Sequence, residues 1–158
     1  MTDKRIIDRF ISKYHLGGNI ERVKWVSDSK SLSAKFINDS QSLVGKVISK
    51  NFNFPVGEFG IYSTSTLSKL LGILENEVMF DVNKEGGTPS KFILADTSMD
   101  ISFNLADPQV IPTVPTINKM EGNVEIELNE EFTTKFIKAK EAVVGAQEYL
   151  EFELKEPA

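Results

Sequence analysis

The feature that most constrains the fold of this chain is a unit that recurs along it: an alternating strand, a capped amphipathic helix and further alternating strands. Helices are predicted to begin near Asp3, Thr64 and Asn129, so that successive copies start about 61 and 65 residues apart. A nearly constant spacing of this size is typical of stacked or arrayed copies of one structural unit. The sequence therefore predicts a fold built from repeats.

Each predicted helix gathers its apolar residues on one face. The first helix, Asp3 to Tyr14, has them at close to helical spacing (Ile6, Ile7, Phe10, Ile11 and Tyr14). The second follows the turn Ser63–Thr66 and spans residues 66–75, and the third spans about 130–144. Helices this short are marginal in water by themselves, so we expect their apolar faces to be buried against sheet, with the first two helices side by side. The leading strand of the first copy is expected to be missing or very short.

The predicted strands alternate apolar and polar residues, which is typical of antiparallel sheet covered on one side. The pattern is clear in residues 78–82, 101–105, 124–128 and 150–154. Hairpin turns are predicted at Asp28–Lys30, Asn38–Ser40 and Glu85–Pro89. The predicted fold class is therefore α+β, with repeats of β-α-β-β-β and helices on one face of antiparallel sheet.

A proline-rich stretch divides the chain. Three prolines fall between Pro108 and Pro115, which excludes a helix or a central strand and indicates an extended linker. We therefore expect a first domain at 1–107, made of half-units at about 1–57 and 58–107. The linker spans 108–122, and a partial second domain spans 123–158.

Composition limits the class of protein. The chain has no cysteine, which excludes disulfides and thiolate metal sites. No apolar run approaches the roughly 20 residues of a membrane-spanning helix, and no signal-peptide pattern follows the N-terminal charges. These features predict a cytoplasmic protein with no membrane partner.

Charge is distributed unevenly. The whole net charge of −5 arises after Ile111, since the chain up to that residue is neutral. An acidic balance argues against general nucleic-acid binding. Basic residues nevertheless gather on the predicted helices: Lys4, Arg5, Arg9, Lys13, Lys69, Lys135, Lys138 and Lys140. Ordinary solvated helix faces would give the same pattern.

Several stretches together resemble the DNA polymerase sliding clamps, and most closely those of tailed phages. The stretches are Phe59-Gly-Ile-Tyr62, Leu67-Ser-Lys-Leu-Leu-Gly-Ile-Leu74, Val78-Met-Phe-Asp81, Lys91-Phe-Ile-Leu-Ala-Asp96, Asn104-Leu-Ala-Asp-Pro108 and Glu125-Ile-Glu-Leu-Asn-Glu-Glu-Phe132. The last of these resembles the start of the family's second domain. That domain stops after strand, helix and strand, so we expect that the chain as given cannot close the family's ring and self-associates through open sheet edges.

The resemblance implies a DNA-clamp-like fold and a processivity factor: a homo-oligomeric ring that encircles duplex DNA without reading its sequence and tethers replication proteins. It implies that the eight helix cations face DNA. It also implies that DNA polymerase and the clamp loader dock peptides on the linker, at Val110, Ile111, Val114 and Ile117. No cofactor, metal or catalytic residue is implied. For a phage-encoded clamp, the location would be the host cell cytoplasm.

Enzymatic alternatives are weaker. His15 is the only histidine, and a catalytic histidine needs a nucleophile and an orienting acid. Asp81, Asp96, Asp100 and Asp107 lack calcium-loop spacing. Trp25 fits a strand core better than a ligand-stacking site. The sequence therefore predicts a non-enzymatic protein. The alternative to a clamp is an α+β adaptor module that binds only protein partners.

Overall fold

The computed structural model describes residues 2–119, 121–143, 145, 153 and 155. These residues fall into two compact units, Met1–Ile117 and Asn118–Ala158. The elements of the first unit are β1 (Thr2–Asp3), α1 (Lys4–His15), β2 (Val23–Ser27), β3 (Ser31–Ile37), β4 (Val44–Lys50), β5 (Gly57–Ile61), α2 (Thr64–Ile73), β6 (Glu77–Glu85), β7 (Thr88–Ala95) and β8 (Asp100–Asn104), with short 3-10 turns at Leu16–Gly18 and Pro108–Val110. The second unit contains α3 (Glu130–Ala142).

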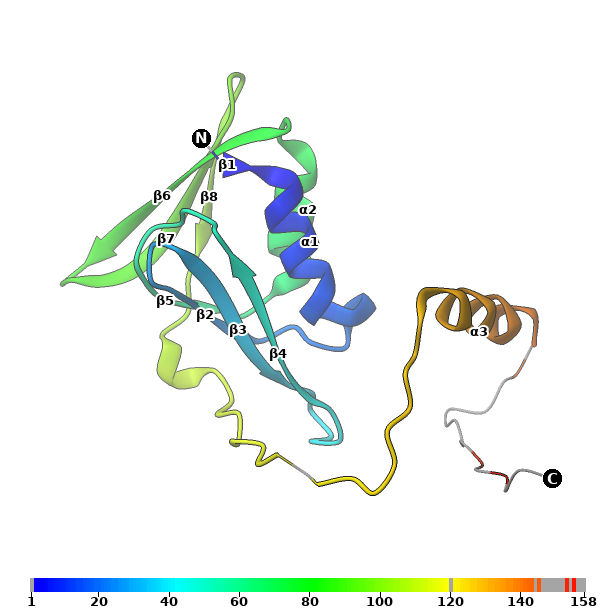
Figure 1. Ribbon diagram of the computed structural model, residues 1–158. Coiled ribbons are helices and arrows are strands. Elements are labelled where there is room, and N and C mark those ends of the chain that lie inside the picture. Colours follow the sequence, from blue (N-terminus) through cyan, green and yellow to red (C-terminus); the bar gives the residue numbers. More distant parts are fainter. Residues whose placement is uncertain (1, 120, 144, 146–152, 154, 156–158) are drawn as a thin grey trace. The chain divides into compact units, whose positions relative to one another are not determined.

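The first unit repeats one order of elements and exchanges its leading strands. β1-α1-β2-β3-β4 is followed by β5-α2-β6-β7-β8. All strand pairs are antiparallel, in two four-stranded sheets of order β1-β6-β7-β8 and β4-β3-β2-β5 (Figure 1). Each half-unit therefore adds its first strand to the sheet of the other half, which ties the two halves into one folding unit. The predicted α+β fold class is confirmed, and β1 is indeed only two residues long.

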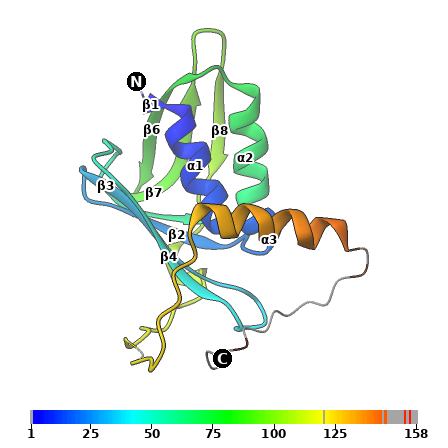
Figure 2. The same cartoon turned by 45° about the vertical axis from the view of Figure 1, so that its right-hand side comes forward.

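Helices α1 and α2 lie side by side, as predicted (Figure 2). They cover two sheets and not one continuous sheet, which is a difference from the prediction. Among the described residues, one β-bridge, between Gly60 and Ala106, joins the two sheets by backbone pairing. The pairing stops there because Pro108, two residues on, has no amide hydrogen to donate.

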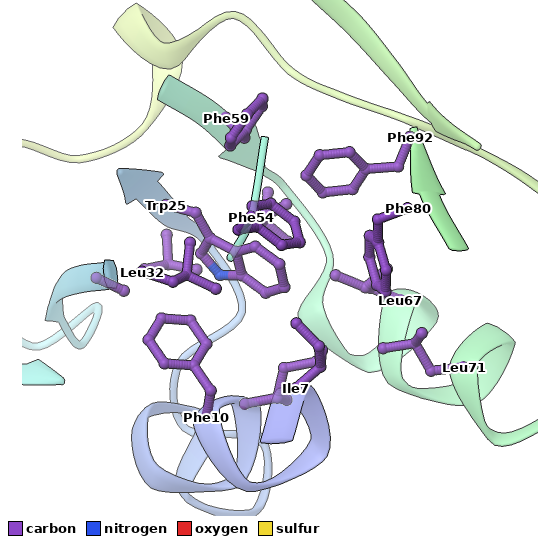
Figure 3. Packing of buried hydrophobic residues seen from close by; sticks show 14 of the residues in the cluster. Ile7, Phe10, Trp25, Leu32, Phe54, Phe59, Leu67, Leu71, Phe80 and Phe92 are labelled. Atoms are coloured by element: carbon purple, nitrogen blue, oxygen red, sulfur yellow. The ribbon is translucent and has the colours of Figure 1, made fainter. Parts of the chain in front are cut away.

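One aromatic core joins both helices and both sheets. Trp25 of β2 is fully buried, and its ring centroid lies 5.4 Å from that of Phe10 on α1 and 5.9 Å from those of Phe54 and Phe92 (Figure 3). Phe92 belongs to β7, so this cluster spans the two sheets. Trp25 is therefore a core residue, as its strand position predicts, and is not available to stack on a ligand.

Local signals set the helix boundaries. The side chain of Asp3 accepts a hydrogen bond from the amide of Arg5 at 2.9 Å, which caps α1. Ser63 caps α2, so this helix begins at Thr64, where the repeat spacing predicts a start, and two residues before the predicted range 66–75. Asn129 caps α3 by accepting from the amide of Phe132 at 2.8 Å. All three predicted hairpin turns connect paired strands.

The beginning of the linker is more ordered than predicted. The Asp107 side chain accepts from the amide of Gln109 at 2.9 Å, which caps the 3-10 turn Pro108–Val110. Ile111 follows and is only 7% exposed. The prediction of an extended linker is therefore wrong for residues 108–111, because an Asp-Pro pair favours a turn and Ile111 gains burial.

The strand predicted at Val124–Leu128 does not form. These residues have no regular secondary structure, and Val124, Ile126 and Leu128 are about half exposed. Alternation makes a strand only where a partner strand pairs with it, and no described residue pairs with this segment. The strand predicted at 150–154 lies almost wholly outside the described residues. Within the described part of the chain, no helix is long and apolar enough to cross a bilayer.

Candidate functional site

The exposed side of α1 carries a row of cations. Arg5, Arg9 and Lys13 are four residues apart, so they lie on one stripe of the helix, and all three are exposed. They line a groove of about 510 Å³ between α1 and β4, and Lys50 of β4 lines it as well. The row and Lys50 thus line one groove, together with the Asp3 carboxylate to which Arg5 donates.

Lys50 was not among the residues predicted from the sequence. The sequence signal for the strand that carries Lys50 is the hairpin turn Asn38–Ser40, because a hairpin turn must be followed by a second strand. The approach of that strand to α1 depends on tertiary packing, which no local pattern reveals.

Two cations of α1 are already engaged by nearby acids. The Lys4 amino group lies 3.4 Å from the Asp8 carboxylate, and the Lys4 side chain is only 15% exposed. The Arg5 guanidinium donates to the Asp3 carboxylate at 2.8 Å, and this hydrogen bonding lowers the pKa of Asp3. Arg9 and Lys13 make no ion pair with any described residue, so they are the α1 cations best placed to meet an anion.

The other predicted cations lie on α2 and α3. Lys69 is exposed on α2. On α3 of the second unit, Lys135, Lys138 and Lys140 are exposed. The Lys135 amino group donates to the Glu131 carboxylate one turn earlier at 2.6 Å. Such an exposed pair stabilises a helix by only about 0.3–0.5 kcal/mol, so it does not prevent Lys135 from exchanging partners.

His15 joins the two helices through a polar cluster. Its Nε2 lies 2.9 Å from the Glu21 carboxylate and 3.2 Å from the Ser65 hydroxyl. Glu21 also accepts from the amide of Ser65 at 2.9 Å, at the start of α2, and from the Ser65 hydroxyl. Burial by itself raises the pKa of Glu21, but the bonds from Ser65 and His15 outweigh it and lower the pKa below its usual value.

This cluster brings together a serine, a histidine and an acid, as a nucleophile relay would. In such a relay the acid binds one ring nitrogen and the nucleophile binds the other. Here Nε2 makes both contacts, and Glu21 accepts directly from Ser65. The geometry therefore fastens the start of α2 to the end of α1 and does not activate Ser65.

The four aspartates considered from the sequence as a possible metal site do not form a cluster, and two of them have local structural roles. Asp96 accepts from the amides of Ser98, Met99 and Glu75. The Glu75 amide is the largest of the contacts that hold the pKa of Asp96 well below its usual range. Asp107 caps the linker turn. In the described ranges, no group of three or more acidic or histidine side chains could hold a metal ion.

A second groove lies where the linker crosses the first unit. Its volume is about 590 Å³, and it is lined by Lys24, Val26, Ser33, Lys35, Lys46, Glu58, Pro108, Gln109, Ile111, Pro112, Thr113 and Val114. Of the four linker residues predicted to dock peptides, Ile111 and Val114 line this groove. Val110 and Ile117 are about 60% exposed and lie outside its lining. We call this site the linker groove.

Comparisons with known proteins bear on the fold. No family model matches the chain, and no curated protein matches it. Among solved structures, the DNA polymerase III subunit beta from Pseudomonas aeruginosa matches 72% of this chain with a TM-score of 0.52 and 18% sequence identity. The match covers 31% of that subunit.

A second solved structure, of A. fulgidus PCNA with the C-terminal region of FEN-1, has a TM-score of 0.42. Its identity is 14%, and the match covers 77% of this chain and 49% of that chain. A TM-score this low supports no argument. At 18% identity the first likeness establishes the fold alone: the chain has a clamp-like α+β fold.

Proposed function

We propose that this chain is part of a DNA polymerase sliding clamp of the tailed-phage type, which encircles duplex DNA and tethers replication proteins. The observation that supports it best is the pair of adjacent helices, α1 and α2, in a clamp-like fold. Arg9, Lys13 and Lys69 are exposed on these helices, whose opposite sides are buried in the core.

The chemistry of such a contact is simple. Phosphates of duplex DNA attract lysine and arginine side chains whatever the base sequence, and binding releases condensed counterions. A protein that slides needs this attraction and no base-specific hydrogen bonds. The net charge of the whole chain is −5, so the surface as a whole attracts DNA only weakly.

The proposal includes a homo-oligomeric ring, loading by a clamp loader and a cytoplasmic location. It includes no catalytic step. Partner proteins would dock at the linker groove, where Ile111 and Val114 are the predicted docking residues that line the cavity. The cations of α3, Lys135, Lys138 and Lys140, would add to the DNA-facing surface.

Binding of the full chain to duplex DNA tests the proposal. Affinity for a labelled 30-base-pair duplex should fall linearly with salt on logarithmic axes. The double variant Arg9→Glu/Lys13→Glu should bind more weakly and have a shallower slope. Lys30→Glu/Lys84→Glu is the matched control, since both lysines are exposed in or beside hairpin turns and neither lines the groove beside α1.

Retention on circular DNA tests the ring. Because the chain as given is expected not to close the ring by itself, it should be lost equally from a nicked circular plasmid and from the same plasmid after linearisation. Retention on the circular plasmid alone would show that copies of this chain do close a ring. No binding to duplex DNA would overturn the proposal in favour of an adaptor that binds only proteins. An equal loss in both double variants would overturn the assignment of the DNA contact to the helices.

A further inference from the structure

The outward face of the β4-β3-β2-β5 sheet carries a row of lysines in the linker groove. Lys24 of β2 lies opposite Lys35 of β3, and Lys35 lies opposite Lys46 of β4. Directly opposed residues on one face have Cβ atoms about 4.5–5.5 Å apart, and like charges at that distance destabilise a sheet. We call these three residues the lysine row.

Little in the described structure neutralises the lysine row. The Lys24 amino group lies 3.2 Å from the Glu58 carboxylate. Lys35 and Lys46 are exposed, and neither makes an ion pair with a described residue. Among the described residues, Glu58 is the only acid that lines the groove, so two positive charges there lack a counter-charge within that part of the chain.

The linker forms an apolar wall beside the lysine row. Ile111, Pro112 and Val114 line the groove together with Val26, which projects from β2. The linker is fixed at its start, because the amide of Ala106 donates to the Gly60 carbonyl at 2.9 Å. Burial of Ile111 then holds the following residues against the first unit. The groove is therefore preformed, with cations on its floor and apolar side chains on its wall.

The lysine row faces away from the helices. Along β2 and β3, Trp25 and Ala34 are buried in the core that α1 and α2 cover, and Lys24 and Lys35 are their neighbours in sequence. Successive side chains of a strand point to opposite faces, so the lysine row lies on the sheet face opposite the helices. DNA held by the helices would leave it free.

We propose that the linker groove binds an extended acidic–apolar peptide of a partner protein, with an acidic side chain between Lys35 and Lys46 and an apolar one against Ile111 and Val114. This inference rests on the proposed function, in which partners dock at the linker, and it specifies the chemistry of the partner. The positive charges of Lys35 and Lys46 favour an acidic residue in the bound peptide. The apolar surface of Ile111 and Val114 favours an apolar residue beside it in the peptide.

Selection from a random dodecapeptide library displayed on phage tests this proposal, with the 158-residue chain as bait. Peptides that bind the unmodified chain should be enriched in Asp or Glu beside Leu, Ile or Phe. Lys35→Glu/Lys46→Glu should lose those peptides at least tenfold and select basic ones in their place. Both lysines are exposed, so this variant should keep the unfolding midpoint of the unmodified chain.

The control Lys30→Glu/Lys84→Glu should select the same acidic peptides as the unmodified chain. The proposal is overturned if no peptide is enriched, if the enriched peptides lack acidic residues, or if reversal of Lys35 and Lys46 leaves the selection unchanged. It is also overturned if that reversal weakens duplex binding as much as Arg9→Glu/Lys13→Glu does, since the lysine row would then belong to the DNA surface. Failure of duplex binding with retained peptide selection would instead reject the DNA proposal alone.

Discussion

Gly60 of β5 lies directly opposite Ala106, in the one β-bridge that joins the two sheets among the described residues. The amide of Ala106 donates to the Gly60 carbonyl at 2.9 Å. A Cβ on Gly60 would lie 2.3 Å from the Ala106 carbonyl oxygen. The bridge and the start of the linker therefore depend on the absence of a side chain at this position.

Gly60→Ala should destabilise the first unit by about 1–3 kcal/mol, the usual cost of overpacking against backbone that must shift. Equilibrium unfolding in urea measures this change. Gly72→Ala is the control, because nothing lies within 4 Å of its added Cβ and alanine favours a helix by up to about 1 kcal/mol. Equal stability of the two variants would show that the bridge between the sheets can relax without cost.

Tyr14→Phe should destabilise the fold by about 1–3 kcal/mol, because it leaves a buried donor without a partner. The Tyr14 hydroxyl accepts from the Trp25 indole at 3.2 Å and lies 3.1 Å from the Thr64 hydroxyl. Burial raises the pKa of Tyr14, so the phenol stays protonated. Thermal unfolding followed by Trp25 fluorescence measures the change. Tyr62→Phe, at an exposed position, should have no effect; a similar loss there would refute this assignment.

Glu21→Gln should lower stability by about 1 kcal/mol at neutral pH, as the loss of a helix cap does, and by less in acid. The pKa of Glu21 is lowered in the folded state. A carboxylate of this kind stabilises the fold above its unfolded pKa and loses that contribution as pH falls through the folded pKa. The difference between the two proteins should therefore shrink below about pH 4.5.

Urea unfolding at several pH values measures that difference. Glu85→Gln is the control, since this side chain is exposed in a hairpin and its substitution should change stability little at any pH. A stability difference for Glu21→Gln that is constant between pH 3 and pH 7 would contradict the assignment.

Lys135→Glu/Lys138→Glu should weaken duplex binding without unfolding the chain, if α3 faces DNA as proposed. Exposed substitutions of this kind usually change stability by less than about 0.5 kcal/mol. Each lost phosphate contact lowers the salt slope by about 0.9, so the double variant should lose nearly two units. Salt titrations of duplex binding measure the slope, and an unchanged slope would exclude α3 from the DNA-facing surface.

Local chemistry determined what the sequence could reveal. The caps Asp3 and Asn129 each bond an amide within three residues, and the turn at Glu85–Pro89 uses two glycines with positive φ. Interactions of this range are encoded by neighbouring residues, so helix positions, turns and the β-α-β-β-β order could be predicted. The repeat spacing predicted the start of the second helix near Thr64, whereas the range 66–75 was two residues late because Ser63, and not a later residue of the turn, caps the helix.

Only the tertiary structure decided which distant segments meet. It paired β1 with β6 and β5 with β2, left residues 124–128 without a strand partner among the described residues, and brought His15, Glu21 and Ser65 together. It also aligned Lys24, Lys35 and Lys46 across three strands and put Lys50 beside α1. The pattern of apolar and polar residues along the chain indicates whether a segment is a helix or a strand and which of its faces is buried. Which strands pair, and in which register, depends instead on contacts between residues far apart in sequence.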